Sequence, residues 1–194
     1  MGFFTRSVAV MTTTTDHTET AASDSRLDFD EHAAGFSRAL AHLDRAATKE
    51  LDQAGIDPKL RELIRVRASQ LNGCAYCVDM HTKDARARGE TEQRLYLLDA
   101  WRETPFYTDR ERAALLWTEA VTDIAKDRVP DEVFEAVRPW FSEAEMVDLT
   151  MAVVAINSWN RFNVALRTVP GGYQPGAFTR PIHAASETPV EAAV

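Results

Sequence analysis

The fold is decided by residues 57–89, which read DPKLRELIRVRASQLNGCAYCVDMHTKDARARG. Asp57 followed by Pro58 is a typical helix start, because aspartate caps free N–H groups and proline fits the first helical position. Apolar residues then recur at helical spacing, at Leu60, Leu63, Ile64, Ala68 and Leu71. One face of this helix should therefore be buried, and the helix should end near Gly73.

Helical signals continue on both sides of this first helix. A second helix is expected from about Cys74 to Arg88, closed by Gly89. Further helices are predicted at about Phe29 to Gln53, at Thr91 to Trp101, from Pro130, and after capping boxes at Thr108 and Ser142, the last reaching about Leu166. Because no alternating strand pattern or repeat is evident, the sequence predicts an all-α bundle of about six or seven helices. A thioredoxin fold, which needs strands, is excluded.

The expected domain organisation follows from composition. Residues 1–25 are poor in large apolar groups and predict a disordered leader, within which Met11 is a possible start site. Residues 26–170 form the helical domain, and residues 171–194, rich in proline and glycine, form a C-terminal tail. The last long helix is apolar over much of its circumference, which predicts a central core helix or a subunit interface.

Charge and hydropathy exclude several classes of function. The formal net charge of −8 disfavours binding to nucleic acids or anionic membranes. No apolar run approaches the roughly 20 residues that cross a bilayer, and the first residues lack a secretory signal pattern. We therefore expect a soluble, cytoplasmic protein.

The only two cysteines, Cys74 and Cys77, are the strongest chemical signal. Residues three apart at a helix start lie roughly 5 Å apart at Cα, so their sulfurs can form a disulfide reversibly. The positive end of the helix favours a thiolate, and this argument alone favours Cys74 as the reactive sulfur. Zinc is the rival interpretation, although Cys74, Cys77 and His81 give only three of four ligands.

Other candidate residues surround this pair. His81 lies one turn after Cys77, where an imidazole can accept and return a thiol proton. Glu62 lies about opposite the apolar face of its helix, so periodicity alone indicates a solvated charge, although Val66 and Ser69 on its own side indicate that this face is not fully exposed. Basic residues form a local positive excess, and most are expected on solvated faces: Arg61, Arg65, Arg67, Lys83, Arg86 and Arg88.

Glu62, the Cys74-x-x-Cys77 pair and His81 together resemble the alkylhydroperoxidase D-like (AhpD-like) branch of the carboxymuconolactone decarboxylase family. The resemblance is strong over about 57–98 and loose over about 29–166. It implies an all-helical fold that assembles as trimers or hexamers, and a relay in which Glu62 and His81 move protons to the cysteines.

The resemblance also implies the reaction. Cys77 attacks a hydrogen or organic peroxide, Cys74 resolves the sulfenic acid to a disulfide, and an external thiol reduces it. Neither metal nor organic cofactor is required. Tyr76 is a possible auxiliary residue: the founding alkylhydroperoxidase has histidine there, and a phenol with a pKa near 10 is a poor base at neutral pH.

Two other functions remain open. The chain is either a dithiol carrier that reduces a partner peroxidase or a non-redox, decarboxylase-like protein whose cysteines are incidental. The retained cysteine pair argues against the second, because lactone decarboxylases of this family do not depend on a dithiol.

Overall fold

The computed structural model of the protein describes residues 25–177. Within this stretch the chain forms helices and turns and no strand, so the predicted all-α class is confirmed. The expected leader lies outside the described residues except for Ser25, as do residues 178–194 of the expected tail. None of the described helices is long and apolar enough to cross a membrane.

Six α-helices of seven or more residues build the described domain: α1 (Phe29–Gln53), α2 (Pro58–Leu71), α3 (Ala75–Ala87), α5 (Asp109–Thr122), α7 (Asp131–Val137) and α8 (Glu143–Leu166). The short helices α4 (Glu92–Tyr96) and α6 (Ile124–Asp127) and two 3₁₀ helices, η1 (Leu98–Glu103) and η2 (Arg138–Trp140), complete the order.

The predicted helix starts are confirmed by their capping contacts. The Asp57 side chain accepts the Lys59 N–H at 2.8 Å, with Pro58 as the first residue of α2. Thr108 and Ser142 begin complete capping boxes, in which the third residue of the helix bonds back to the cap. These are short-range contacts, which explains why the sequence alone located them.

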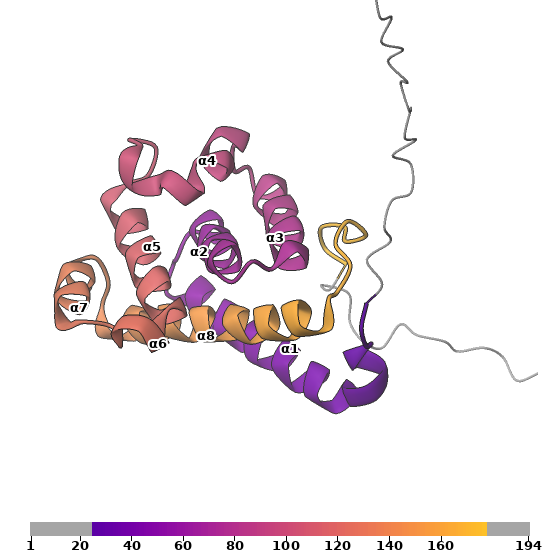
Figure 1. Cartoon of the computed structure of the whole chain (residues 1–194). Helices are drawn as coiled ribbons and strands as arrows, with labels where there is room; N and C mark the ends of the chain where they lie inside the picture. The colour runs from indigo at the N-terminus through magenta and orange to yellow at the C-terminus, as the bar shows by residue number, and fades with distance from the viewer. Residues whose placement is uncertain (1–24, 178–194) are drawn as a thin grey trace, which may run out of the picture.

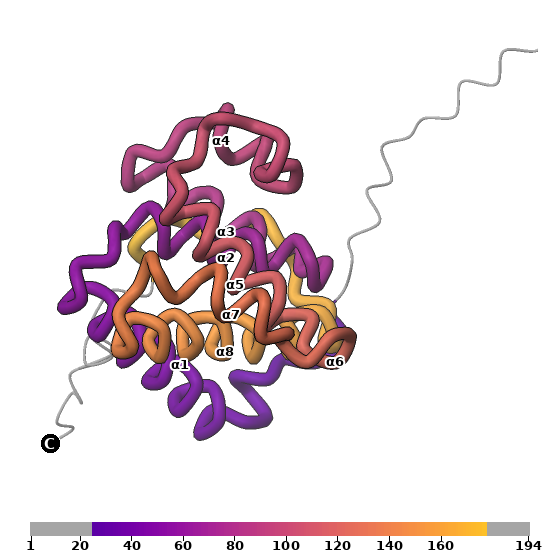
Figure 2. The backbone as a smooth tube through the Cα atoms, turned by 90° about the vertical axis from the view of Figure 1, so that its left-hand side faces the viewer, coloured from indigo at the N-terminus to yellow at the C-terminus, as the bar shows by residue number. Residues whose placement is uncertain are grey.

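Helix α2 lies at the centre of the bundle. Figure 1 looks nearly along its axis, with α3, α5 and α8 around it and α1 on the far side of α8. Figure 2, turned by 90°, shows α8 running beneath α2 and α5. The main core lies between α1, α2, α5, α7 and α8, and includes Leu51, Ile64, Val137 and Val153, all fully buried. This packing buries α2 on every side from Leu60 to Ser69.

Two expectations for the outer helices were wrong in part. The helix expected from Thr91 to Trp101 is broken, since α4 ends at Tyr96 and η1 follows. The break lets Leu98 and Trp101 enter a second core cluster, where the Trp101 ring nitrogen donates to Glu119 at 2.8 Å. In α1, Phe36 belongs to the expected apolar stripe but is 75% exposed.

Helix α8 has two different sides. Leu149, Val153 and Ile156 are buried in the bundle, as expected for a central core helix. Apolar side chains on its other side are exposed, namely Val147, Val154, Phe162 and Val164. Phe162 also packs on Phe29 at the start of α1, with ring centroids 5.6 Å apart.

Candidate active site

The two cysteines lie where α2 turns into α3. Gly73 has a φ of +66°, a conformation that favours glycine, and it brings the chain round so that Cys74 caps α3. Cys74 and Cys77 form a disulfide, with their Cα atoms 5.4 Å apart. Both cysteines are 1% exposed. The predicted coupling of the two sulfurs is therefore present, inside the protein and not on its surface.

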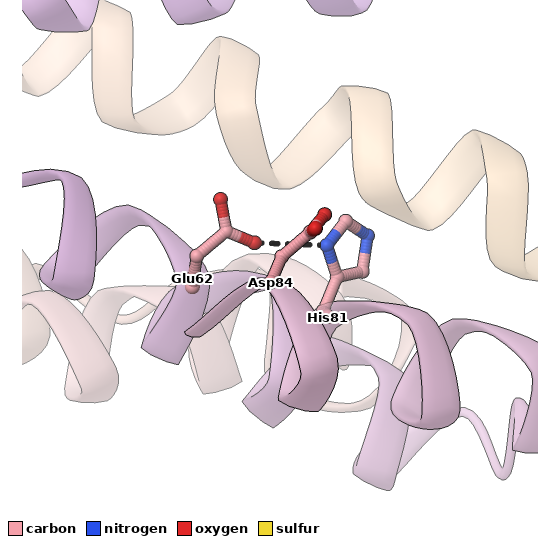
Figure 3. A group of neighbouring side chains, drawn as sticks. All are labelled: Glu62, His81 and Asp84. Carbon is pink, nitrogen blue, oxygen red and sulfur yellow. Dashed lines mark hydrogen bonds and ion pairs between the residues drawn. The ribbon is translucent and has the colours of Figure 1, made fainter. Parts of the chain in front are cut away.

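A buried carboxylate–imidazole pair lies beside this turn. The Nδ1 atom of His81 is 2.9 Å from Oε2 of Glu62, which α2 contributes from the other side of the turn (Figure 3). Glu62 is fully buried and His81 is 5% exposed. The interpretation of Glu62 as a solvated charge was wrong, because α2 has no solvent-facing side at this position.

Glu62 is held in its charged form. Burial opposes the charge, but the hydrogen bond with His81 and the guanidinium of Arg65 outweigh it and lower the pKa of Glu62 to about 2. An ionised carboxylate accepts hydrogen bonds and donates none, so Nδ1 of His81 carries the proton. In the neutral imidazole Nε2 is therefore the acceptor, which is the atom a general base needs.

Arginines surround Glu62. Arg65 donates to Glu62 Oε1 at 3.0 Å, and the Nε atoms of Arg61 and Arg88 lie 3.8 Å from the same oxygen. Arg65 also reaches Asp44 and Thr48 of α1, at 3.1 and 2.7 Å.

The expectation of solvated faces was wrong for three of the basic residues. Arg61, Arg65 and Arg67 are at most 7% exposed, and each is ion-paired. The three guanidinium groups can be buried because each of them is paired with at least one carboxylate, which compensates its charge.

A third residue, the acidic Asp84, approaches the pair. Glu62, His81 and Asp84 each offer a ligand atom within 4.8 Å of the others (Figure 3). A metal ion there would also face the guanidinium groups next to Glu62, which repel a cation. The arrangement therefore suits a hydrogen-bonded relay better than a metal centre.

The chain after α8 folds back onto α3 close to Asp84. The Tyr173 hydroxyl donates to both oxygens of Asp84, at 2.9 and 3.1 Å. Burial and then the Asp84 carboxylate raise the pKa of Tyr173 to about 12, so its hydroxyl stays a donor. Lys83 holds the same segment by donating to the carbonyl groups of Gly171 and Tyr173, at 3.0 and 3.1 Å.

A side-chain amide from α8 reaches the sulfurs. Nδ2 of Asn163 lies 3.4 Å from Sγ of Cys77 and donates to it. Asn163 is one of three buried asparagines spaced three apart on α8, with Asn157 and Asn160. The sequence reasoning missed them, and the signal available was this regular polar spacing in an otherwise apolar helix.

Tyr76 lies between the cysteines in sequence and packs against their cluster. Burial, followed by the negative charges of Asp30 and Asp79, raises the pKa of Tyr76 above its usual value of 10. This strengthens the expectation that Tyr76 is a poor base at neutral pH.

In the described part of the chain, His81 makes no hydrogen bond to either sulfur. A proton that passes between His81 and a sulfur therefore needs a substrate atom or a water molecule between them.

Comparisons with known proteins agree with this geometry. Residues 34–120 match the model of the carboxymuconolactone decarboxylase family. YdfG of Bacillus subtilis (strain 168) is 51% identical over 118 residues, which are 61% of this chain and 80% of YdfG.

Two solved structures extend the comparison to the fold. The Agrobacterium tumefaciens protein ATU0492, described as a putative antioxidant defence protein AhpD, superposes with a TM-score of 0.72 at 39% identity, over 77% of this chain and 100% of its own. An alkylhydroperoxidase AhpD core protein from Ralstonia eutropha JMP134 superposes with a TM-score of 0.64 over 74% of each chain. Because the two sequences are only 23% identical, this similarity supports a shared fold and nothing about function. The chain therefore belongs to the carboxymuconolactone decarboxylase family and has the fold of its AhpD-like proteins.

Proposed function

We propose that the protein is a thiol-dependent peroxidase that reduces hydrogen peroxide or organic peroxides. The observation that carries this proposal is the joined pair Cys74–Cys77 beside the buried Glu62–His81 hydrogen bond. A dithiol that closes a disulfide without backbone rearrangement, next to an imidazole whose Nδ1 proton is held by a carboxylate, has the parts that peroxide reduction needs. The family membership and the antioxidant description of the Agrobacterium relative support it.

The proposed cycle has three steps. The Cys77 thiolate attacks one peroxide oxygen, so that an S–O bond forms, the O–O bond breaks, and the leaving alkoxide or hydroxide takes a proton by way of His81. Cys74 then attacks the sulfur of the resulting sulfenic acid, which forms the disulfide and releases water. An external dithiol, either a protein or a small molecule, reduces the disulfide and is itself oxidised.

Burial of the pair adds a step before the chemistry. Both sulfurs are 1% exposed and pack against Ala68 and Ile156, with Tyr76 and Trp159 at the edge of the cluster. Peroxide and reductant must therefore wait for a local opening, which we place at Tyr76 and Trp159, the partly buried members.

The test is peroxide consumption supported by a dithiol reductant, comparing the wild type with Cys77→Ser and Cys74→Ser. Cys77→Ser should lose turnover to the background level, because the attacking sulfur is gone and Cys74 alone cannot close the disulfide. Cys74→Ser should retain a single reaction with peroxide and accumulate sulfenic acid, detected by a dimedone adduct at Cys77. Full turnover in Cys77→Ser would refute the proposal.

A dithiol carrier is the second candidate, and the Tyr76 position favours it. The raised pKa of Tyr76 makes this side chain a poor proton donor or acceptor for peroxide cleavage. Stopped-flow measurement of thiol consumption separates the candidates, since a peroxidase reacts faster with peroxide than with a protein disulfide, and a carrier shows the reverse.

Assembly into trimers or hexamers stays a prediction from the resemblance, and the cytoplasmic location stays a prediction from the sequence. The apolar side chains that α8 exposes are suitable contacts for another copy, in particular Val147 at 62% and Val154 at 40%.

A further inference from the structure

The two sulfurs have different hydrogen-bond donors. Cys74 Sγ accepts the backbone N–H of Cys77 at 3.3 Å, within the first turn of α3. Backbone N–H groups and the helix dipole thus favour a thiolate at Cys74. Cys77 Sγ accepts instead from the side chain of Asn163 at 3.4 Å. The backbone alone therefore favours a thiolate at Cys74, which is the resolving sulfur in the proposed cycle. The hydrogen bond from Asn163 of α8 favours a thiolate at Cys77 instead.

We propose that Asn163 donates a hydrogen bond to the Cys77 thiolate of the reduced protein and thereby makes Cys77, and not Cys74, the attacking sulfur. The inference rests on the thiol chemistry proposed above and adds a catalytic residue to it, from an element 86 residues away in sequence. Donation to a charged acceptor is roughly twice as strong as donation to a neutral one. The bond therefore strengthens when the disulfide opens and Cys77 becomes charged.

The Asn163 amide is fixed in the orientation that this role needs. Its Nδ2 also donates to the carbonyl oxygen of Trp159 at 3.0 Å. A carbonyl oxygen only accepts, so the nitrogen of the amide must lie on this side, and its second N–H is free to face the sulfur. Asn163 is 6% exposed, so water competes little for that hydrogen.

Helix α8 is itself anchored next to the cysteine turn. Asn160 donates to the hydroxyl of Ser69 at 3.0 Å and accepts from Asn72 at 3.0 Å, and both partners lie at the end of α2. Asn72 also donates to Asn157 at 2.9 Å. These contacts set the rotation and depth of α8 against α2, and so place Asn163 over Cys77.

Charged groups do not explain a preference for Cys77 by themselves. His81 lies one turn further along α3, and its Nδ1 is bonded to Glu62, which is paired with Arg65 of α2. From α1, Asp30 acts on Tyr76 together with Asp79 of α3, and a negative charge there opposes a thiolate. In the described part of the chain, no charged side chain donates a hydrogen bond to either sulfur.

The experiment locates the reactive sulfur directly. The protein is fully reduced, treated with limiting iodoacetamide at neutral pH, and digested, and mass spectrometry gives the ratio of alkylated Cys77 to alkylated Cys74. We expect the wild type to favour Cys77 by about tenfold and Asn163→Ala to lose this preference. In a Cys74→Ser background, the pH midpoint of Cys77 alkylation should rise by about one unit with Asn163→Ala, and further with Asn163→Asp, which adds a negative charge.

The control is Thr150→Val. Thr150 is also a polar side chain of α8, but it accepts from Trp117 and donates to its own helix at Met146, so its replacement should leave ratio and midpoint unchanged. Circular dichroism and denaturant unfolding verify the fold, and Asn163→Asp, which has the same size, replaces Asn163→Ala if the latter does not fold.

Two results would overturn the inference: preferential alkylation of Cys74 in the wild type, or a wild-type ratio and midpoint in a folded Asn163 variant. Because alkylation needs no peroxide, a wild type without peroxide turnover would refute the peroxidase proposal and leave this result standing.

Discussion

Glu62 shows at the residue scale how a buried charge sets the state of its neighbour. Its carboxylate stays ionised and holds the proton on Nδ1 of His81. Glu62→Gln keeps the shape and an acceptor oxygen but removes the charge that stabilises a protonated imidazole. We expect peroxide turnover to fall by about 100-fold, typical of a lost contribution to acid–base catalysis, and its pH profile to shift.

Glu90→Gln is the matched control for this residue. Glu90 is also a buried carboxylate, 8% exposed, and its partner is Arg94, 3.0 Å away, on α4. Steady-state kinetics over a range of pH should give a wild-type profile for Glu90→Gln. An unchanged profile in Glu62→Gln would show that Glu62 is only structural.

Helix α3 shows at the element scale that one cysteine has two roles. Cys74 is the N-cap of α3 and accepts the N–H of Cys77 with its side chain. Replacement by serine removes the disulfide but keeps a capping oxygen, whereas alanine removes both. We expect Cys74→Ala to be less stable than Cys74→Ser by about 1 kcal/mol in urea unfolding of the reduced proteins.

The reduced wild type is the reference for this comparison, because it separates capping from cross-linking. Cys74→Ser should unfold at the same or a slightly higher urea concentration than the reduced wild type. Equal stability of the serine and alanine variants would mean that the Cys74 side chain does not cap α3 when reduced.

The whole molecule should lose stability in acid through its buried carboxylates. Glu62 has a pKa of about 2 when folded and 4.5 in its usual state, so the unfolded chain binds more protons between these values. The contribution of Glu62 is therefore complete above pH 4.5 and is lost as the pH falls towards 2, by at most about 3 kcal/mol.

Glu119 acts in the same direction. Burial opposes its charge, but hydrogen bonds from Arg102, Trp101 and Arg67 lower the pKa of Glu119. Unfolding measured from pH 6 to pH 2 should show a smaller loss of stability for Glu62→Gln and for Glu119→Gln than for the wild type. Parallel curves for all three proteins would contradict this assignment.

The sequence by itself determined where most of the helices begin and how the two cysteines are spaced. Caps such as Asp57, Thr108 and Ser142 act over two or three residues, and the spacing of Cys74 and Cys77 fixes their separation within one helical turn. Such contacts are local, so they can be read without knowing where the helices pack. The family resemblance, and not periodicity, is what made Glu62 a candidate site residue.

Only the tertiary structure decided what surrounds these residues. Periodicity assumes that a helix has one exposed side, but α2 is enclosed by α3, α5 and α8, which buries Glu62 and Arg65 together. The contacts of Asn163 with Cys77 and of Tyr173 with Asp84 join residues more than 80 positions apart. They depend on how α8 and the segment after it pack against α3, because distant segments meet only when the whole core forms.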